Sequence, residues 1–137
     1  MTHQSFKDNL SISKKTSGWE PLKSSGPPAG LGSIGNQMVR SAVEAINGRD
    51  RERWFELFSE KTAFSDDGIN TDFTSWCDRE LFGSVIAYIV SIDKVEEGGL
   101  TFFASYHSDR WGDFKTFWRF KTGGGKFSKL DVGATNY

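Results

Sequence analysis

Turns that contain glycine divide the second half of the chain, and this feature constrains the fold more than any other. They lie at residues 96–99, 111–113 and 123–125, between runs of β-branched and aromatic residues. Glycine allows the backbone angles of tight hairpin turns, and no helical pattern separates the runs. The pattern predicts an up-and-down antiparallel meander of four strands, at about residues 85–95, 100–108, 114–121 and 127–132.

The first half carries helical patterns instead. Apolar residues recur every three or four positions over residues 33–47, and residues 50–59 form a second, shorter helical segment whose apolar residues are Trp54, Phe55, Leu57 and Phe58. Ser33 and Asp50 precede these runs and are the expected N-caps, because their side-chain oxygens can accept hydrogen bonds from the first turn. Two consecutive helices are therefore predicted.

A third helix is expected before the meander begins. Thr74 or Ser75 is its expected N-cap, and residues 82–83 end it. A short strand is expected earlier, at residues 62–65. Because three helices come first and the strands follow without helices between them, the chain is predicted to be an α+β protein with a mostly antiparallel, curved sheet.

One domain, at residues 33–137, contains all of these elements. Residues 1–32 are rich in Ser, Lys, Gly and Pro and show no sustained apolar period, so a flexible N-terminal arm is predicted there. The beginning of the chain also lacks the apolar run of a signal peptide or a membrane span. A cytoplasmic protein that does not bind membranes is the expectation.

Charge and ligand types argue against several classes of partner. The 17 Lys and Arg residues nearly balance the 18 Asp and Glu residues, which disfavours binding to nucleic acid. Cys77 is the only cysteine and is expected to be a packing residue. His107 is the only histidine of the predicted domain, so the sequence predicts neither a metal site nor a cofactor.

Several short motifs resemble those of one protein family. The stretches are FSDDG at residues 64–68, DFTSW at 72–76, YHSDRWG at 106–112 and TFWRF at 116–120. They resemble bacterial SnoaL-like members of the nuclear transport factor 2-like superfamily, and the likeness extends over about residues 33–133. The resemblance implies a cone-shaped fold in which three helices lie against the concave face of the sheet around an interior pocket. It also implies a homodimer.

Two places in the sequence are candidates for acid–base chemistry. His107 and Asp109 share one face of a predicted strand, so the carboxylate could orient the imidazole as a general base. The alternative is that both residues only close the hairpin that follows. Asp66 is a candidate carboxylate at the mouth of the pocket, beside aromatic surface. Its alternative role is to satisfy backbone donors in a turn.

The wall of the pocket is predicted to be aromatic, with His107 as its polar anchor. The predicted wall residues are Trp54, Phe58, Trp76, Phe82, Phe103 and Trp118. Residues 33–47 contain no tyrosine, and no catalytic set of the superfamily's known enzymes can be matched to this chain.

The sequence therefore predicts a small-molecule pocket protein for an apolar ligand, and two functions stay open. One is a cofactor-independent isomerase, cyclase, dehydratase or hydrolase that uses general acid–base chemistry. The other is a noncatalytic ligand-binding or dimerisation module of the same fold. A homodimer is expected in either case, because a monomer would expose apolar side chains on the outward face of the sheet.

Overall fold

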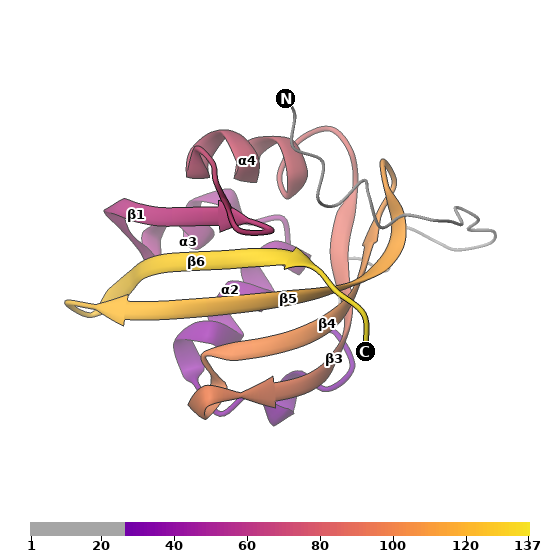
Figure 1. The fold of residues 1–137 in the computed structure, drawn as a ribbon, viewed down its shortest axis with the longest axis horizontal. Coiled ribbons are helices and arrows are strands. Elements are labelled where there is room, and N and C mark those ends of the chain that lie inside the picture. The colour runs from indigo at the N-terminus through magenta and orange to yellow at the C-terminus, as the bar shows by residue number, and fades with distance from the viewer. Residues whose placement is uncertain (1–26) are drawn as a thin grey trace.

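The computed structural model describes residues 27–137, and its largest feature is the predicted meander. Four consecutive strands pair antiparallel in sequence order, which confirms the pattern of glycine turns (Figure 1). Their bounds are β3 (Ala87–Glu96), β4 (Thr101–Ser108), β5 (Gly112–Gly123) and β6 (Lys126–Ala134). The glycine-rich segment between β3 and β4 includes a single short turn of 3-10 helix, η3 (Glu97–Gly99).

Two further strands extend the sheet beyond β6. They are β1 (Phe58–Asp66) and β2 (Ile69–Asn70), and the strand order is β2-β1-β6-β5-β4-β3. The sequence predicted only a short strand at residues 62–65, and it gave no parallel pairing. In the structure β1 starts at Phe58 and runs parallel to β6. The partner of β1 lies more than sixty residues further along the chain, so no local pattern indicates this pairing.

Three α-helices of six residues or more are described, and their first turns show how each begins. Their bounds are α2 (Gln37–Asn47), α3 (Arg51–Glu56) and α4 (Phe73–Glu80). Asp50 caps α3 as predicted. The N-cap of α2 is Asn36 rather than Ser33, and the N-cap of α4 is Asp72 rather than Thr74 or Ser75. In each case the side-chain oxygen accepts a hydrogen bond from the N–H three residues later.

The folded part of the chain begins earlier than residue 33. Pro28 is buried, and the carbonyl of Ala29 accepts a hydrogen bond of 2.8 Å from the backbone N–H of Ile92, on the edge strand β3. A 3-10 turn, η2 (Leu31–Ser33), then leads to α2. The predicted arm of residues 1–32 is therefore corrected at its end, because residues 28–31 belong to the domain. Residues 1–26 lie outside the described part of the chain.

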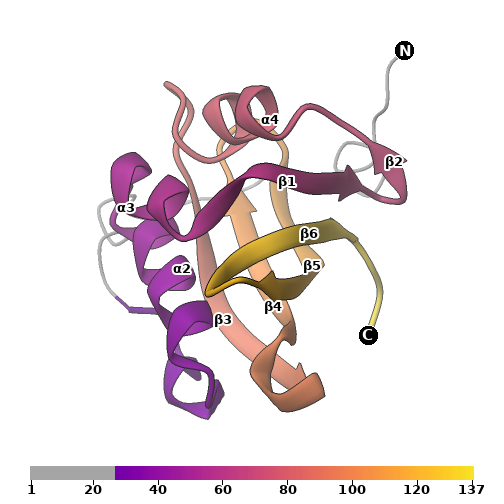
Figure 2. The ribbon, with the colours of Figure 1, turned by 90° about the vertical axis from the view of Figure 1, so that its left-hand side faces the viewer.

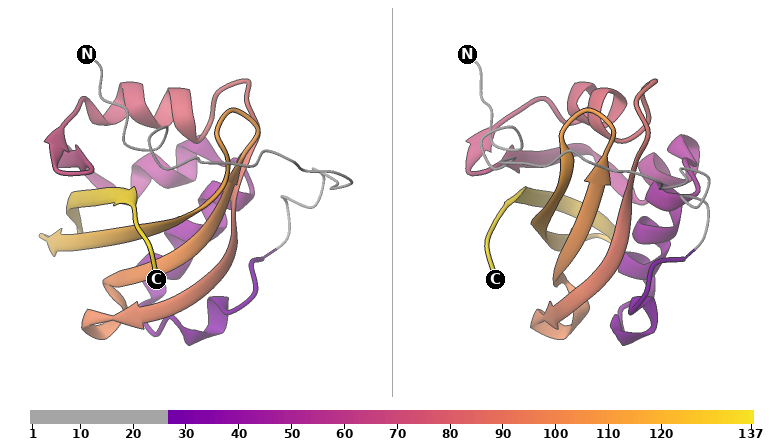
Figure 3. Two further views of the ribbon diagram at one scale, coloured as in Figure 1. Left: turned by 45° about the vertical axis from the view of Figure 1, so that its right-hand side comes forward. Right: turned by 90° about the vertical axis from the view of Figure 1, so that its right-hand side faces the viewer.

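The helices cover one face of the bent sheet, which is called the inner face here (Figures 2 and 3). Alternate strand residues face this side, and they build the aromatic core together with α2, α3 and α4. The fully buried residues of the inner face include Phe102, Ala104, Tyr106, Trp118 and Leu130. The residues between them lie on the opposite, outer face of the sheet.

Asn47, the last residue of α2, fastens the helix to the sheet edge. Its side-chain amide donates to the carbonyl of Ile89 and accepts from the N–H of the same residue, both at 2.9 Å. Edge strands expose unpaired backbone groups that invite association with other chains. Asn47 and Ala29 together satisfy this part of the β3 edge.

Candidate functional site

Four of the six predicted wall residues lie together inside the domain. Trp54, Phe58, Trp76 and Trp118 are all buried in the core. The ring centroids of Trp54 and Phe58 are 4.8 Å apart, and those of Trp76 and Trp118 are 6.5 Å apart. Phe82 packs against this cluster from the segment after α4, with its ring 6.2 Å from Trp54.

The other two predicted members, Phe103 and the proposed anchor His107, lie on the outer face. Phe102 packs inward against Trp118, so its neighbour Phe103 points outward and meets Tyr137 instead. His107 shares the outward side with Phe103, as alternation along β4 requires. The sequence correctly grouped Phe103 with His107, but it assigned their face to the wrong side of the sheet. The predicted wall is therefore corrected: these two residues do not meet the other five.

Asp66 is the candidate carboxylate that the structure places inside. It is the last residue of β1 and pairs with Val132, whose side chain is on the inner face beside Trp118. Only 4% of Asp66 is exposed, and its Oδ2 accepts a hydrogen bond of 3.0 Å from the indole N–H of Trp76 on α4. The preceding residue, Ser65, points outward and donates to Asp131. Asp66 therefore faces the aromatic interior.

The turn after β1 explains why Asp66 can hold this position. Asp67 follows with a positive φ of 60°, and its N–H donates to the carbonyl of Val132 at 2.7 Å. Gly68 also has a positive φ, which glycine adopts without strain. Asp67, rather than Asp66, therefore forms the turn, and the side chain of Asp66 continues the alternation of β1.

A second polar group of the inner face is Tyr106 on β4. Its hydroxyl donates to the carbonyl of Glu80 at 3.4 Å, and the pKa of its phenol lies well above the usual value because of burial and the nearby charge of Glu80. Glu80 also accepts from the indole N–H of Trp111 at 3.0 Å. A phenol with a raised pKa keeps its proton and can serve as a hydrogen-bond donor.

Cys77 is inert in this setting. Burial raises the pKa of its thiol far above the ordinary value, so the reactive thiolate is not formed at neutral pH. The indole N–H of Trp54 points at its sulfur, 3.3 Å away.

His107 joins two carboxylates on the outer face, at the end of the β4–β5 hairpin. Its Nε2 lies 2.7 Å from Oδ1 of Asp109, and its Nδ1 lies 2.5 Å from Oδ1 of Asp113. The sequence predicted the contact with Asp109. Asp113 was not predicted as a partner, because residues 111–113 were predicted to be a turn. In the structure β5 starts at Gly112, and Asp113 lies opposite His107. An imidazole can donate to two carboxylates at once only when both ring nitrogens carry hydrogen.

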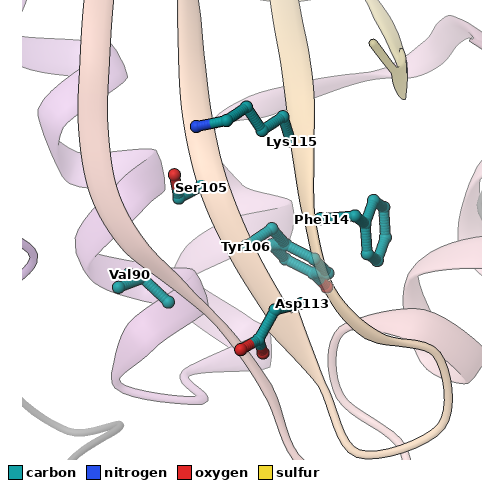
Figure 4. Close-up of a pocket in the computed structure, with 6 residues that line it drawn as sticks. All are labelled: Val90, Ser105, Tyr106, Asp113, Phe114 and Lys115. Atoms are coloured by element: carbon teal, nitrogen blue, oxygen red, sulfur yellow. The ribbon is translucent and has the colours of Figure 1, made fainter. Parts of the chain in front are cut away.

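A groove of about 260 Å³ opens on the outer face next to this cluster (Figure 4). Its lining comes from three adjacent strands and comprises Val90, Ser105, Tyr106, Asp113, Phe114 and Lys115. In Figure 4 the amine of Lys115 and the ring of Phe114 lie on opposite sides of β5, so the charged side chains border the groove while Phe114 points inward. Val90 is the extra residue of a bulge in β3 and is 40% exposed.

Two further features are absent from residues 27–137. No three or more His, Cys, Asp or Glu side chains in this part of the chain are arranged to hold a metal ion. None of the helices described there is long and apolar enough to cross a membrane.

Comparison with known proteins identifies the fold. The structure is similar to that of a protein from Sphaerobacter thermophilus, at a TM-score of 0.57 and 16% identity over 73% of this chain and 94% of that one. A nuclear transport factor 2-like protein of unknown function from Cytophaga hutchinsonii matches at a TM-score of 0.56 and 13% identity, over 72% and 87% of the two chains. A protein from Xanthomonas campestris, described as a candidate polyketide cyclase, matches at a TM-score of 0.55 and 16% identity, over 69% and 85%.

These matches define an α+β protein with the nuclear transport factor 2-like fold. The resemblance seen in the sequence motifs is thereby confirmed at the level of the fold. No family model matches the sequence, and no curated protein matches it either.

Proposed function

We propose that this chain binds a small apolar molecule on the inner side of its sheet and that Asp66 acts there as a general acid–base. The observation that carries the proposal is a carboxylate placed among aromatic rings, with Trp76 as its hydrogen-bond donor. Burying a carboxylate costs free energy unless its partners compensate, and such groups are concentrated at functional sites.

The proposed chemistry is removal of a proton from a carbon next to a carbonyl group. The carboxylate of Asp66 takes the proton, and the electron pair of the broken C–H bond moves onto the carbonyl oxygen to form an enolate. The indole N–H of Trp76 holds Oδ2 and thereby fixes the orientation of the carboxylate. The description of the Xanthomonas protein as a candidate polyketide cyclase is in keeping with carbonyl chemistry on this fold.

The test measures proton abstraction directly with 2-tetralone, a bicyclic aromatic ketone that has acidic C–H groups. Its deuterium uptake in D2O is followed by NMR with the wild-type protein, with Asp66→Asn and with Asp67→Asn as the matched control. Asp66→Asn should lower the exchange rate by about 10²- to 10⁴-fold, the usual contribution of a general base. Asp67→Asn should leave the rate within a few fold, because Asp67 lies in the exposed turn.

Noncatalytic binding is the second candidate, because the close packing of the rings beside Asp66 leaves little room for a substrate to reach its carboxylate. Phe64 and Trp76, for example, are only 4.8 Å apart between centroids beside Asp66. If 2-tetralone binds, as seen by chemical-shift changes, but the wild-type protein does not catalyse exchange above buffer, a binding module is the correct assignment. Equal exchange by wild type and Asp66→Asn would remove Asp66 from the proposal.

A further inference from the structure

The segment that follows β6 lies over the outer face of the sheet (Figure 1). The backbone N–H of Thr135 donates to the carbonyl of Lys115 on β5 at 2.9 Å. Two residues later, the hydroxyl of Tyr137 donates to Oδ2 of Asp93 on β3 at 2.8 Å. Because β5 and β4 lie between β6 and β3, residues 135–137 cross two strands to reach the edge of the sheet.

Three residues, one from each of the strands β3, β4 and β5, hold the side chain of Tyr137. Asp93 accepts its hydrogen bond. The rings of Tyr137 and Phe103 are nearly perpendicular with centroids 5.5 Å apart, and Nζ of Lys115 lies 4.7 Å from the centroid of Tyr137. We call Asp93, Phe103 and Lys115 the Tyr137 site. A charged acceptor, an aromatic ring and a cation are groups that recognise a phenol.

The carboxylate of Asp93 is fixed in place by its own strand and the next one. Asp93 is the extra residue of a second bulge in β3, and a bulge re-aims a side chain. Ser91 donates to its Oδ1 and Ser105 donates to its Oδ2, both at 2.7 Å. Partial burial favours the neutral form, but the hydrogen bonds from three hydroxyl groups outweigh it and lower the pKa of Asp93. The site therefore holds an oriented, ionised acceptor.

Tyr137 itself fills this site loosely. It is 49% exposed, so its ring gains little free energy from burial and can leave at small cost. Burial and the hydrogen bond to Asp93 raise the pKa of its phenol, so the phenol keeps its proton and acts as the donor. The carboxylate that Tyr137 would leave behind still favours a hydroxyl donor. A phenol from solution can therefore take its place.

The groove of about 260 Å³ adjoins the Tyr137 site (Figure 4). Lys115 belongs to both, and Ser105 lines the groove while it donates to Asp93. Val90 lines the groove as an apolar residue, and Asp113 lies two residues before Lys115 on β5, a step of about 7 Å. A ligand whose ring replaces that of Tyr137 would extend a substituent into this groove.

The Asp113 end of the groove is negatively charged. Asp113 and Asp109 both contact His107, so one imidazole can offset at most one of the two carboxylates. The charge of Lys115 is matched by Asp93, which lies 3.9 Å away. A substituent with a positive charge is therefore favoured in the groove.

We propose that the Tyr137 site binds a phenol with a short cationic arm, which lies in the groove beside Asp113, and that Tyr137 competes with this ligand. The site is on the opposite face of the sheet from Asp66, so it is independent of the function proposed above. Tyr137 reduces the apparent affinity for the ligand to the extent that it fills the site. Removing its side chain should therefore strengthen binding.

The probe is tyramine, a phenol with an aminoethyl arm. The full chain is titrated with tyramine up to about 10 mM, which detects a millimolar dissociation constant, and amide shifts are followed by NMR. Tyr137→Ala should bind about tenfold more tightly than the wild type, because a hydrogen bond to a charged acceptor keeps the site filled in most molecules. Amides of the Tyr137 site should shift. Glu52→Ala, on the exposed surface of α3, is the matched control and should bind as the wild type does.

Two analogues separate the contributions of the hydroxyl and the arm. Phenethylamine lacks the hydroxyl and should bind Tyr137→Ala about tenfold more weakly than tyramine does. In 4-propylphenol a methyl group replaces the ammonium, and binding should weaken by about threefold, because Asp113 is an exposed partner. Adding Asp113→Asn should remove this preference for tyramine and leave binding of 4-propylphenol unchanged. Asp109→Asn is the matched control, because Asp109 also contacts His107 but lies outside the lining of the groove.

Thermal melting followed by circular dichroism checks that Tyr137→Ala is folded, and retained binding of 4-propylphenol checks Asp113→Asn. If Tyr137→Ala melts far below the wild type, Tyr137→Phe replaces it, since it keeps the ring and loses the hydrogen bond, and it should also bind tyramine more tightly than the wild type. Equal affinities of the wild type and the Tyr137 variant would overturn the proposal. So would equal binding of tyramine and phenethylamine, or the absence of shifts at the Tyr137 site.

Discussion

Trp54 and Trp76 are both buried indoles, and they differ in what their N–H groups contact. Trp76 donates to the carboxylate of Asp66, whereas Trp54 donates to the sulfur of Cys77. Sulfur is a weak acceptor, and a hydrogen bond to a charged group contributes more to stability than a neutral one. The same substitution at the two tryptophans therefore isolates what the Trp76–Asp66 hydrogen bond contributes to the stability of the fold.

We expect Trp76→Phe to lower the free energy of unfolding by about 1 to 3 kcal/mol more than Trp54→Phe does. Both substitutions remove the same volume and leave a phenyl ring, so loss of packing largely cancels in the comparison. Urea denaturation of the two variants and the wild type gives the difference. Equal losses would mean that the Trp76 hydrogen bond does not stabilise Asp66 in its inward position.

At the scale of secondary structure, Gly30 shows why the domain starts before residue 33. It has a φ of +84°, and a Cβ atom there would lie 2.5 Å from the carbonyl oxygen of Ile92. Gly68 has nearly the same φ, +85°, but a Cβ atom at that position would have no neighbour within 4 Å. An alanine at either position would therefore have the same backbone strain, but only an alanine at position 30 would also collide with the sheet.

Gly68→Ala should cost about 1 kcal/mol of stability through backbone strain alone. Gly30→Ala should cost more, by about 1 to 2 kcal/mol, because the segment must also move away from β3. Thermal or urea unfolding of the two variants tests this. Equal effects would show that residues 28–30 contribute little to the edge of the sheet.

The sequence predicted the meander well because each hairpin is local. The residues that form a turn and the strands beside it lie within about twenty positions, so glycine spacing indicates them. Alternation also grouped Phe103 with His107 correctly. Which side of the sheet receives the helices is decided by packing between distant segments, and the sequence gives no local signal for it. For that reason His107 was expected inside. Asp113 was missed as its partner because residues 111–113 were predicted to be a turn.

The same limit applies to Asp66. The sequence singled it out, but a pair of aspartates before glycine does not indicate which one forms the turn. Its direction depends on the parallel pairing of β1 with β6, which places Asp66 beside Val132 on the inner face.

At the scale of the whole molecule, the pairing of β1 with β6 joins the first half of the chain to its last strand. Leu130 is fully buried, and it pairs with Phe64 on β1 and with Phe120 on β5. In the described part of the chain, β1 has β6 and the two-residue β2 as its only strand partners. The helices and the meander should therefore unfold together rather than as separate units.

Leu130→Ala tests this coupling. Removing a buried leucine side chain should lower the free energy of unfolding by about 2 to 5 kcal/mol. Ser128→Ala, two residues earlier on the same strand, should have a small effect, because its hydroxyl makes only a 3.4 Å contact with the carbonyl of Lys121.

Urea unfolding is followed by far-ultraviolet circular dichroism and by tryptophan fluorescence, since Trp54 and Trp76 report on the helices and Trp118 reports on the sheet. Coincident curves with a lowered midpoint are expected, because loss of β6 packing removes the support of β1 at the same time. Separate transitions in the variant would instead show that the helical half remains folded without the C-terminal strand.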